Sequence, residues 1–370
     1  MITLSTEPQR FDATAEMHDP SPRQTSHPPT ARPGISVEHA ALLNEFERFI
    51  HRDPARRGLI SSELTEAGQS AKTAVRLVAG QLASAAIDLA QHARRVAIVT
   101  GFFIPHAEPP SAETDGPPGT LFLAHCLQAL GIDAAVITDG PCASALRAAA
   151  NGIDFPLDRL FVAPLNADDW CDEFLQSDFA RDLTHLIAVE RVGPSHTPES
   201  ADIGFDVSPE HHNRSHNMRG VCIDARTAPL HLLFERLPTF SPHAHTIGVG
   251  DGGNEIGMGS IPWSELRRRL SGDHAGRVPC RIACDFNIVA GTSNWGAMAL
   301  AAATCLLSDR VDVLQPWSQA RHQSWLEHLV ANGPAVDGVT GRREATVDGL
   351  PFLTYIQPWE GIRRLLGWND

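Results

Sequence analysis

Short apolar runs alternate with longer mixed segments from residue 37 onward. Runs rich in Val, Ile and Leu predict strands within residues 94–104, 132–139, 158–165, 183–193, 245–252 and 281–291. Amphipathic patterns predict helices at 37–53, 72–93 and 119–131. Because the strand runs do not alternate apolar with polar residues, they are typical of strands covered on both faces. The pattern therefore predicts an α/β fold, a mostly parallel sheet with helices on both faces in a Rossmann-like three-layer architecture.

The first 36 residues have a different composition from the rest of the chain. They mix Pro, Ser, Thr and charged residues without an apolar period, and we predict a disordered tail there. Residues 37–370 are interpreted as one domain. The tail contains acidic residues and no apolar signal segment, and no run is long enough to span a membrane, so a cytoplasmic location is expected.

The net charge limits the classes of partner that the protein binds, and the cysteine pattern argues against disulfides and a zinc site. The formal net charge of -14 argues against nucleic acid and anionic membranes, which are bound mainly by Lys and Arg. The 7 cysteines are an odd number without a CxxC pair, which favours buried free thiols over disulfides. Cys280 and Cys284 lack the second pair that a zinc site needs. A homodimer is the default for a soluble oligomer.

Polar residues follow four of the predicted strands. Ligands of open parallel sheets bind at the carboxyl ends of the strands, so we expect these residues to form one polar pocket. They are His106, Glu108, Glu113, Thr114 and Asp115 after the first strand, Glu190, Arg191, Ser195 and His196 after the fourth, Asp251, Asn254 and Glu255 after the fifth, and Thr292, Ser293 and Asn294 after the sixth.

The segment "GVGDGGNEIGMG" at 248–259 satisfies the glycine spacing of a dinucleotide fingerprint. Gly257, Gly259 and Pro262 interrupt the helix that the fingerprint requires at its third glycine, so we reject that interpretation. A glycine loop presenting amides to a small anion is favoured, with Asp251 and Glu255 binding an ammonium group or a divalent cation such as Mg²⁺ or Mn²⁺. A tight loop with solvated acids is the alternative.

The segment "GFFIPHAEPPSAETDGPPGT" at 101–120 is too long and too acidic for a simple connector. Its proline pairs stiffen it, and a helix is expected to begin near Gly119 and Thr120 with free amides for a carboxylate or phosphate. Alternatively, Asp115 or Thr120 caps that helix. The histidines in "PEHHNRSHN" are interpreted as a solvated loop, because their spacing does not place three rings on one helix face.

Five blocks in order resemble the D-glutamate cyclase C-terminal-like family. They are "TGFFI…PPSAETDGPPGT", "ERVGPSH", "GVGDGGNEIGMG", "IVAGTSNWGAMAL" and "VDGVTGRREATVDGLP", within residues 52–351. The resemblance implies an enzyme, a lyase that converts D-glutamate to 5-oxo-D-proline with loss of water. Its partner would be a small acidic amino acid, and the chemistry requires no cofactor.

Roles for the strand-end residues follow from that chemistry as hypotheses. Asp251 or Glu255 would take the ammonium proton, Glu113 or Asp115 would act as the acid, and Arg191 would clamp the α-carboxylate. The expected substrate-binding residues are Thr114, Gly119, Thr120, Glu190, Arg191, Gly252, Gly253, Asn254, Ser293 and Asn294. Gly252, Gly253, Ser293 and Asn294 would hold the oxyanion. Two alternatives remain open: a divalent-metal phosphohydrolase or phosphotransferase, and a non-catalytic small-ligand sensor.

Overall fold

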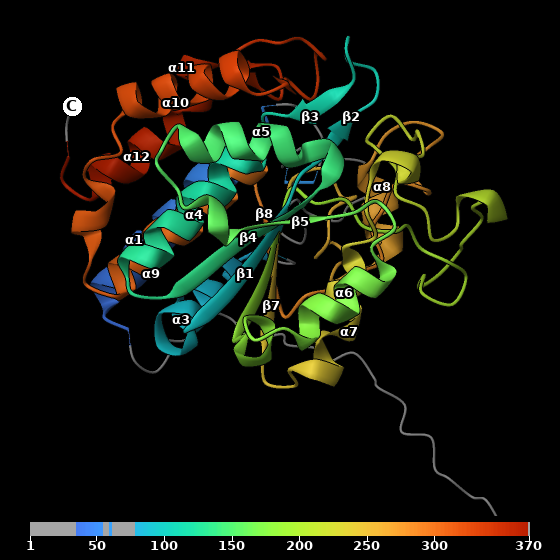
Figure 1. Cartoon of the computed structure of the whole chain (residues 1–370), viewed down its shortest axis with the longest axis horizontal. Helices are drawn as coiled ribbons and strands as arrows, with labels where there is room; N and C mark the ends of the chain where they lie inside the picture. The colour runs from blue at the N-terminus through green and yellow to red at the C-terminus, as the bar shows by residue number, and fades with distance from the viewer. Residues whose placement is uncertain (1–34, 55–58, 61–77, 369–370) are drawn as a thin grey trace, which may run out of the picture.

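A six-stranded parallel sheet lies at the centre of the computed structural model, which describes residues 35–54, 59–60 and 78–368 (Figure 1). The spatial order is β5-β4-β1-β6-β7-β8, so the α/β prediction is confirmed. The strand bounds are β1 Arg95–Thr100, β4 Asp133–Asp139, β5 Leu160–Ala163, β6 His185–Val189, β7 His245–Gly250 and β8 Phe286–Val289.

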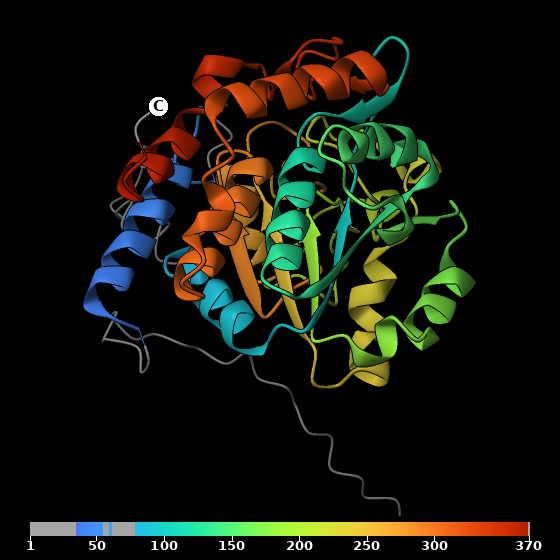
Figure 2. The same cartoon turned by 60° about the vertical axis from the view of Figure 1, so that its left-hand side comes forward.

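Helices cover both faces of this sheet, as Figures 1 and 2 show from two sides. On one face lie α1 (Val37–Ile50), α3 (Gln81–His92), α4 (Pro117–Ala129), α5 (Gly140–Asn151), α9 (Ser293–Leu307), α10 (Gln319–Asn332) and α12 (Gln357–Leu365). On the other lie α6 (Asp168–Gln176), α7 (His231–Phe240) and α8 (Trp263–Arg269). The short α11 spans Phe352–Tyr355, and single 3₁₀ turns lie at Leu157–Arg159, Ala180–Asp182, Pro209–His211, Asp224–Arg226 and Val311–Leu314.

Successive residues of a strand point to opposite faces, and each face has its own buried cluster. In β1, Val96 and Ile98 pack into the cluster under α4 and α9. Ala97 and Val99 pack into the opposite cluster under α6 and α7. Two dry faces need apolar residues at consecutive positions, which explains the unbroken apolar runs of the sequence.

Two smaller sheets accompany the central sheet. β2 (Phe103–Ile104) pairs antiparallel with β3 (Ser111–Glu113), which pairs parallel with β9 (Ala335–Val336). β10 (Thr346–Val347) and β11 (Leu350–Pro351) form a separate hairpin. The pairing of β3 with β9 brings the segment around Glu113 against the distant segment after Val336.

Some predicted boundaries were wrong. The strand predicted for 94–104 ends at Thr100, because Gly101 turns the chain with a φ of 113° before β2. The helix predicted for 72–93 is interrupted at Gly80, which has a φ of 78°, and α3 begins at Gln81. Residues 72–77 lie outside the described residues, as does the predicted tail apart from Ile35 and Ser36, and the Ser36 side chain caps α1.

All seven cysteines are free thiols, and five of them are buried. Burial raises the pKa of Cys280 to about 12, so this thiol stays protonated at neutral pH. Within the described residues, no helix combines the length and the apolar character needed to cross a membrane.

Candidate functional site

The strand order reverses direction at β1, which has β4 on one side and β6 on the other. At such a switch point the loops after the two strands diverge, and a crevice opens at their carboxyl ends. Asp115 follows β1 by way of β2 and β3, and Glu190 directly follows β6. The fold thus brings residues from distant parts of the chain to one edge of the sheet.

Asp115 is held at the N-terminus of α9. Its Oδ2 accepts from the Ser293 amide at 2.8 Å, and its Oδ1 accepts from the amides of Asn294 at 2.9 Å and Gly116 at 3.1 Å. The first amides of a helix have no partner within the helix and carry partial positive charge. These amides stabilise the charged carboxylate and fix its position.

Asn294 makes the complementary contact with α4. Its Oδ1 accepts from the amides of Gly119 at 2.7 Å and Gly116 at 3.1 Å, and its Nδ2 donates to the Thr114 carbonyl. A Cβ at Gly119 would lie 2.7 Å from the Asn294 Cα, so only glycine permits this approach. We expected α4 to begin near Gly119 with free amides. It begins at Pro117, and Asn294 occupies that helix end.

Glu190 has a left-handed backbone conformation with a φ of 45°, which is uncommon for a glutamate. Its Oε2 accepts from the Ser293 hydroxyl at 2.5 Å. One carboxylate oxygen from each of Asp115, Glu190 and Asp251 lies within 4.8 Å of the others, and all three residues are buried. We name these three residues the strand-end acid cluster.

Such close carboxylates do not all remain charged without a cation or a shared proton. The cluster can therefore hold an ammonium group, a proton or a hard divalent cation. Its all-oxygen donors fit Mg²⁺ or Mn²⁺ better than a softer metal.

Glu255 has a different role from Asp251. Its carboxylate accepts from the amides of Gly252 at 2.6 Å and Gly253 at 2.7 Å, within its own loop. These are the amides that we expected to hold an oxyanion, and in this structure they hold Glu255 instead. The loop has no helix at its third glycine, since α8 begins at Trp263, in agreement with the rejected dinucleotide fingerprint.

Arg191 does not lie where a substrate clamp would. Its side chain is 1% exposed, pairs with Asp139 at 2.7 Å, and donates to the carbonyls of Gly101 and Ala228. A guanidinium removed from water needs such partners, and here they tie the end of β4 to the loops after β1 and β6. Arg191 thus stabilises the loops that border the crevice.

The remaining expected residues surround the cluster. The Thr114 hydroxyl donates to the Thr346 carbonyl at 2.7 Å, and the Asn254 Nδ2 donates to the His216 carbonyl at 2.8 Å. Thr120 is buried in the first turns of α4. These contacts tie the loops of Asp115 and Asp251 to the segments around Thr346 and His216.

A pocket of about 150 Å³ opens beside the cluster, and we name it the strand-end pocket. Glu113 and Glu190 line it together with His106, Arg219 and Asn217, and Phe102, Ile104, Met218, Gly338 and Val339 complete its walls. Burial and the Arg219 charge lower the pKa of His106. Sequence reasoning missed Arg219 and Asn217, which lie in an irregular loop without any periodic signal.

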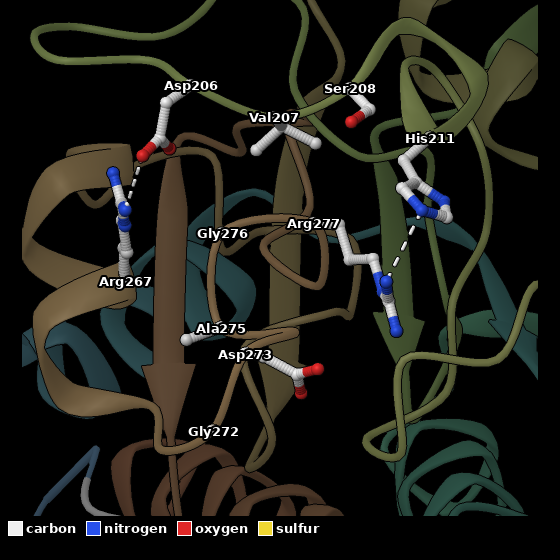
Figure 3. A pocket seen from close by; sticks show the side chains of 10 residues that line it. All are labelled: Asp206, Val207, Ser208, His211, Arg267, Gly272, Asp273, Ala275, Gly276 and Arg277. Atoms are coloured by element: carbon white, nitrogen blue, oxygen red, sulfur yellow. Dashed lines mark hydrogen bonds and ion pairs between the residues drawn. The ribbon is translucent and has the colours of Figure 1, made fainter.

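A second polar pocket, shown in Figure 3, shares none of these residues. Arg267 there pairs with Asp206 at 2.8 Å, and Arg277 contacts His211 at 3.3 Å. The histidine-containing segment 209–217, which we interpreted from the sequence as a solvated loop, borders this second pocket through His211. Its His216 directly precedes Asn217, which lines the strand-end pocket.

Fold and site together define a Rossmann-like α/β protein with an acidic pocket at its topological switch point. The family model described as D-glutamate cyclase-like, C-terminal matches residues 57–363, and the chain belongs to that family. The mitochondrial D-glutamate cyclase of Homo sapiens is 29% identical over 352 residues. The match covers 86% of this chain and 50% of the human protein, so the chain spans about half the length of that relative.

Proposed function

We propose that this protein converts D-glutamate to 5-oxo-D-proline with loss of water in the strand-end pocket. The observation that carries the proposal is the charge pattern of the pocket, which combines Glu113 and Glu190 with Arg219 and His106. The family and the name of the human relative support the same substrate.

The pocket matches the charges of the substrate. D-glutamate carries one ammonium group and two carboxylates, which are separated by a short apolar stem. In our proposal the ammonium group binds near Glu190 and the strand-end acid cluster. The α-carboxylate binds Arg219, the exposed arginine of the pocket lining, in the clamp role we first assigned to Arg191. Phe102 and Ile104 contact the stem.

The reaction is a ring closure within one molecule. The amine nitrogen attacks the γ-carboxyl carbon, an N–C bond forms, and a C–O bond of the tetrahedral intermediate breaks. The ammonium nitrogen loses two protons in total, and the departing oxygen gains two and leaves as water. Holding the substrate folded supplies much of the acceleration, because the reacting atoms are already close.

Two groups must transfer these protons, each taking one from the nitrogen and giving one to the departing oxygen. Asp251 accepts the ammonium proton, since it lies within the acid cluster beside Glu190. Glu113, which also lines the pocket, donates to the departing oxygen when it is protonated and then accepts the second proton of the nitrogen. Asn217 supplies an oxyanion contact: its Oδ1 is held by the amides of Arg219 and Val221 at 3.0 Å, which leaves its NH₂ group as the donor.

A test of this proposal follows conversion by mass spectrometry. Purified protein is incubated with D-glutamate or L-glutamate, with and without EDTA, and loss of water is measured. We expect product from the D isomer, and a decrease in kcat/KM of roughly 10–100-fold in Glu190→Gln, because the ammonium group loses a charged partner. Arg219→Gln should chiefly raise KM, whereas Arg147→Gln, an exposed arginine on α5, should behave as wild type.

The outcomes separate the remaining hypotheses. Folded protein that binds D-glutamate without turning it over would contradict the enzyme and favour a sensor. The three-carboxylate geometry also suits a divalent-metal phosphohydrolase. Phosphate-ester cleavage that requires Mg²⁺ or Mn²⁺, without 5-oxoproline formation, would favour that second function.

A further inference from the structure

A histidine begins each of two neighbouring strands at the opposite end of the sheet. His185 is the first residue of β6 and His245 the first of β7, and the two are partners in the strand register. Asp88 and His92 face them from successive turns of α3. We name Asp88, His92, His185 and His245 the amino-end cluster.

The contacts of this cluster converge on Asp88. Its Oδ2 lies 2.9 Å from the His185 Nε2 and 2.6 Å from the His245 Nδ1, and its Oδ1 lies 2.9 Å from the His92 Nδ1. The rings of His185 and His245 are nearly perpendicular, with centroids 5.9 Å apart. One donor atom from each of Asp88, His185 and His245 lies within 4.8 Å of the others.

Asp88 is a buried carboxylate whose described ion-pair partners are all histidines. Asp88 is 8% exposed, and among the residues that the structure describes its ion-pair partners are these three histidines and no Arg or Lys. A carboxylate removed from water needs hydrogen bonds or a cationic partner, and here three imidazoles converge on it. The same convergence of two imidazole nitrogens and a carboxylate oxygen can hold a metal cation.

We propose that the amino-end cluster binds one Zn²⁺ or a similar transition-metal ion through Asp88, His185 and His245. Two imidazole nitrogens and a carboxylate oxygen are the donors such ions prefer, whereas Mg²⁺ and Ca²⁺ take oxygen ligands. His92 holds the second oxygen of Asp88, and the fourth position faces solvent beside His245, whose side chain is 45% exposed.

The spacing of the donor atoms needs only a small adjustment. In a tetrahedral zinc site with bonds of about 2.0–2.1 Å, neighbouring donor atoms lie roughly 3.3 Å apart. The contacts of 2.6 and 2.9 Å to Asp88 would open by roughly half an ångström. His245 can make this change easily, because its ring reaches the surface.

Both rings can present a lone pair to the metal without releasing a proton. Without a metal, His185 donates from Nε2 to Asp88, and a metal at Nε2 would move that N–H to Nδ1, which lies 3.0 Å from the Thr184 Oγ1. That hydroxyl donates to the Arg95 carbonyl at 2.9 Å and accepts from the amides of Arg94 at 3.0 Å and Arg95 at 3.3 Å, so the ring would share this acceptor with them. In the same way, a metal at the His245 Nδ1 would move its N–H to Nε2. Metal-binding histidines commonly have such an outer partner, which fixes the tautomer.

Metal binding by the full chain tests this proposal. Protein treated with a chelator and dialysed is titrated with Zn²⁺ by calorimetry, and bound metal is measured after gel filtration. We expect one equivalent bound tightly, a higher melting temperature with zinc, and at least roughly 100-fold weaker binding in His245→Gln and Asp88→Asn, since loss of an outer partner alone costs about 10–100-fold.

Two control variants locate the metal. Glu190→Gln in the strand-end acid cluster and His211→Gln at the second pocket should retain the equivalent. Wild type that binds no zinc above the background of the doubly substituted Asp88→Asn, His245→Gln chain would overturn the proposal. So would an equivalent lost with Glu190→Gln or His211→Gln instead. The readout is binding, so these outcomes are independent of D-glutamate turnover.

Discussion

The same two strands carry opposite chemistry at their two ends. β6 begins with His185 and is followed by Glu190, and β7 begins with His245 and is followed by Asp251. Five residues of strand separate the ends by roughly 16 Å. Each end gathers buried charged groups from a third element, Asp115 before α4 at one end and Asp88 in α3 at the other.

The two ends differ in how their negative charge is compensated. At the amino end, burial raises the pKa of Asp88, but hydrogen bonds from His185, His245 and His92 outweigh burial and hold that pKa well below its usual range. At the carboxyl end, three carboxylates crowd together beside a pocket. Concentrated charge next to a cavity is typical of a site that binds a ligand or transfers protons.

Asp251 gives the strongest test of the proposed chemistry at the carboxyl end. We expect Asp251→Asn to reduce kcat/KM for D-glutamate by about 10²–10⁴-fold, because the proposed base is lost. The melting temperature should stay equal or rise, since one of three crowded like charges is removed. Steady-state kinetics and thermal unfolding measure both effects. Full activity would remove Asp251 from the mechanism.

A substitution at Arg191 tests whether its buried ion pair with Asp139 stabilises the carboxyl end of the sheet. Replacing it with Met leaves the buried Asp139 without its partner, and we expect a loss of about 3–5 kcal/mol in the free energy of unfolding. Denaturant unfolding measures this loss. Exposed Arg147→Met is the matched control and should change stability by less than about 0.5 kcal/mol. A stable Arg191→Met protein with weakened substrate binding would restore Arg191 as a clamp.

A substitution at Gly119 tests whether the N-terminal ends of α4 and α9 need to be in close contact. A Cβ there would lie 2.8 Å from the Asn294 Oδ1 as well as close to its Cα, so Gly119→Ala should cost about 1–3 kcal/mol and lower turnover. Gly140→Ala at the start of α5 is the control, because nothing lies within 4 Å of its added Cβ. Equal unfolding free energies for the two variants would contradict this packing.

His322 lies at neither end of the sheet, and its effect on stability is absent at neutral pH. Burial, with the charges of Arg321 and Arg363, lowers the pKa of His322 to about 3 from 6.5. The unfolded chain therefore binds the extra proton first, so stability is fully present above about pH 6.5 and falls as pH decreases toward 3. In His322→Gln the slope between pH 6 and 4 should decrease by about 1.4 kcal/mol per pH unit.

Urea unfolding at several pH values measures this slope in the wild-type and variant proteins. An unchanged slope in His322→Gln would assign the acid sensitivity to other histidines. His216 and His231 are the next to examine, because burial lowers the pKa of each to about 4.

The elements of the fold could be predicted where a local pattern reports burial. The runs around Val96 and Ile187 predicted central strands, because both faces of those strands are covered. Boundaries failed where a single glycine changes the backbone, as at Gly80 and Gly101, since an apolar pattern carries no information about φ. The predicted gathering of Asp115, Glu190 and Asp251 agrees with the switch point of the parallel sheet.

By itself, the sequence determined the α/β class, the order of the six central strands along the chain, and which acids follow which strand, because periodicity and chain order are local properties. The tertiary structure decided which partner each acid has. Glu255 holds its own loop, Arg191 pairs with Asp139, and Arg219 reaches the strand-end pocket from an irregular loop. It also brought Asp88 to His185 and His245, residues separated by 97 and 157 positions. Such contacts depend on packing across the sheet, which no local pattern records.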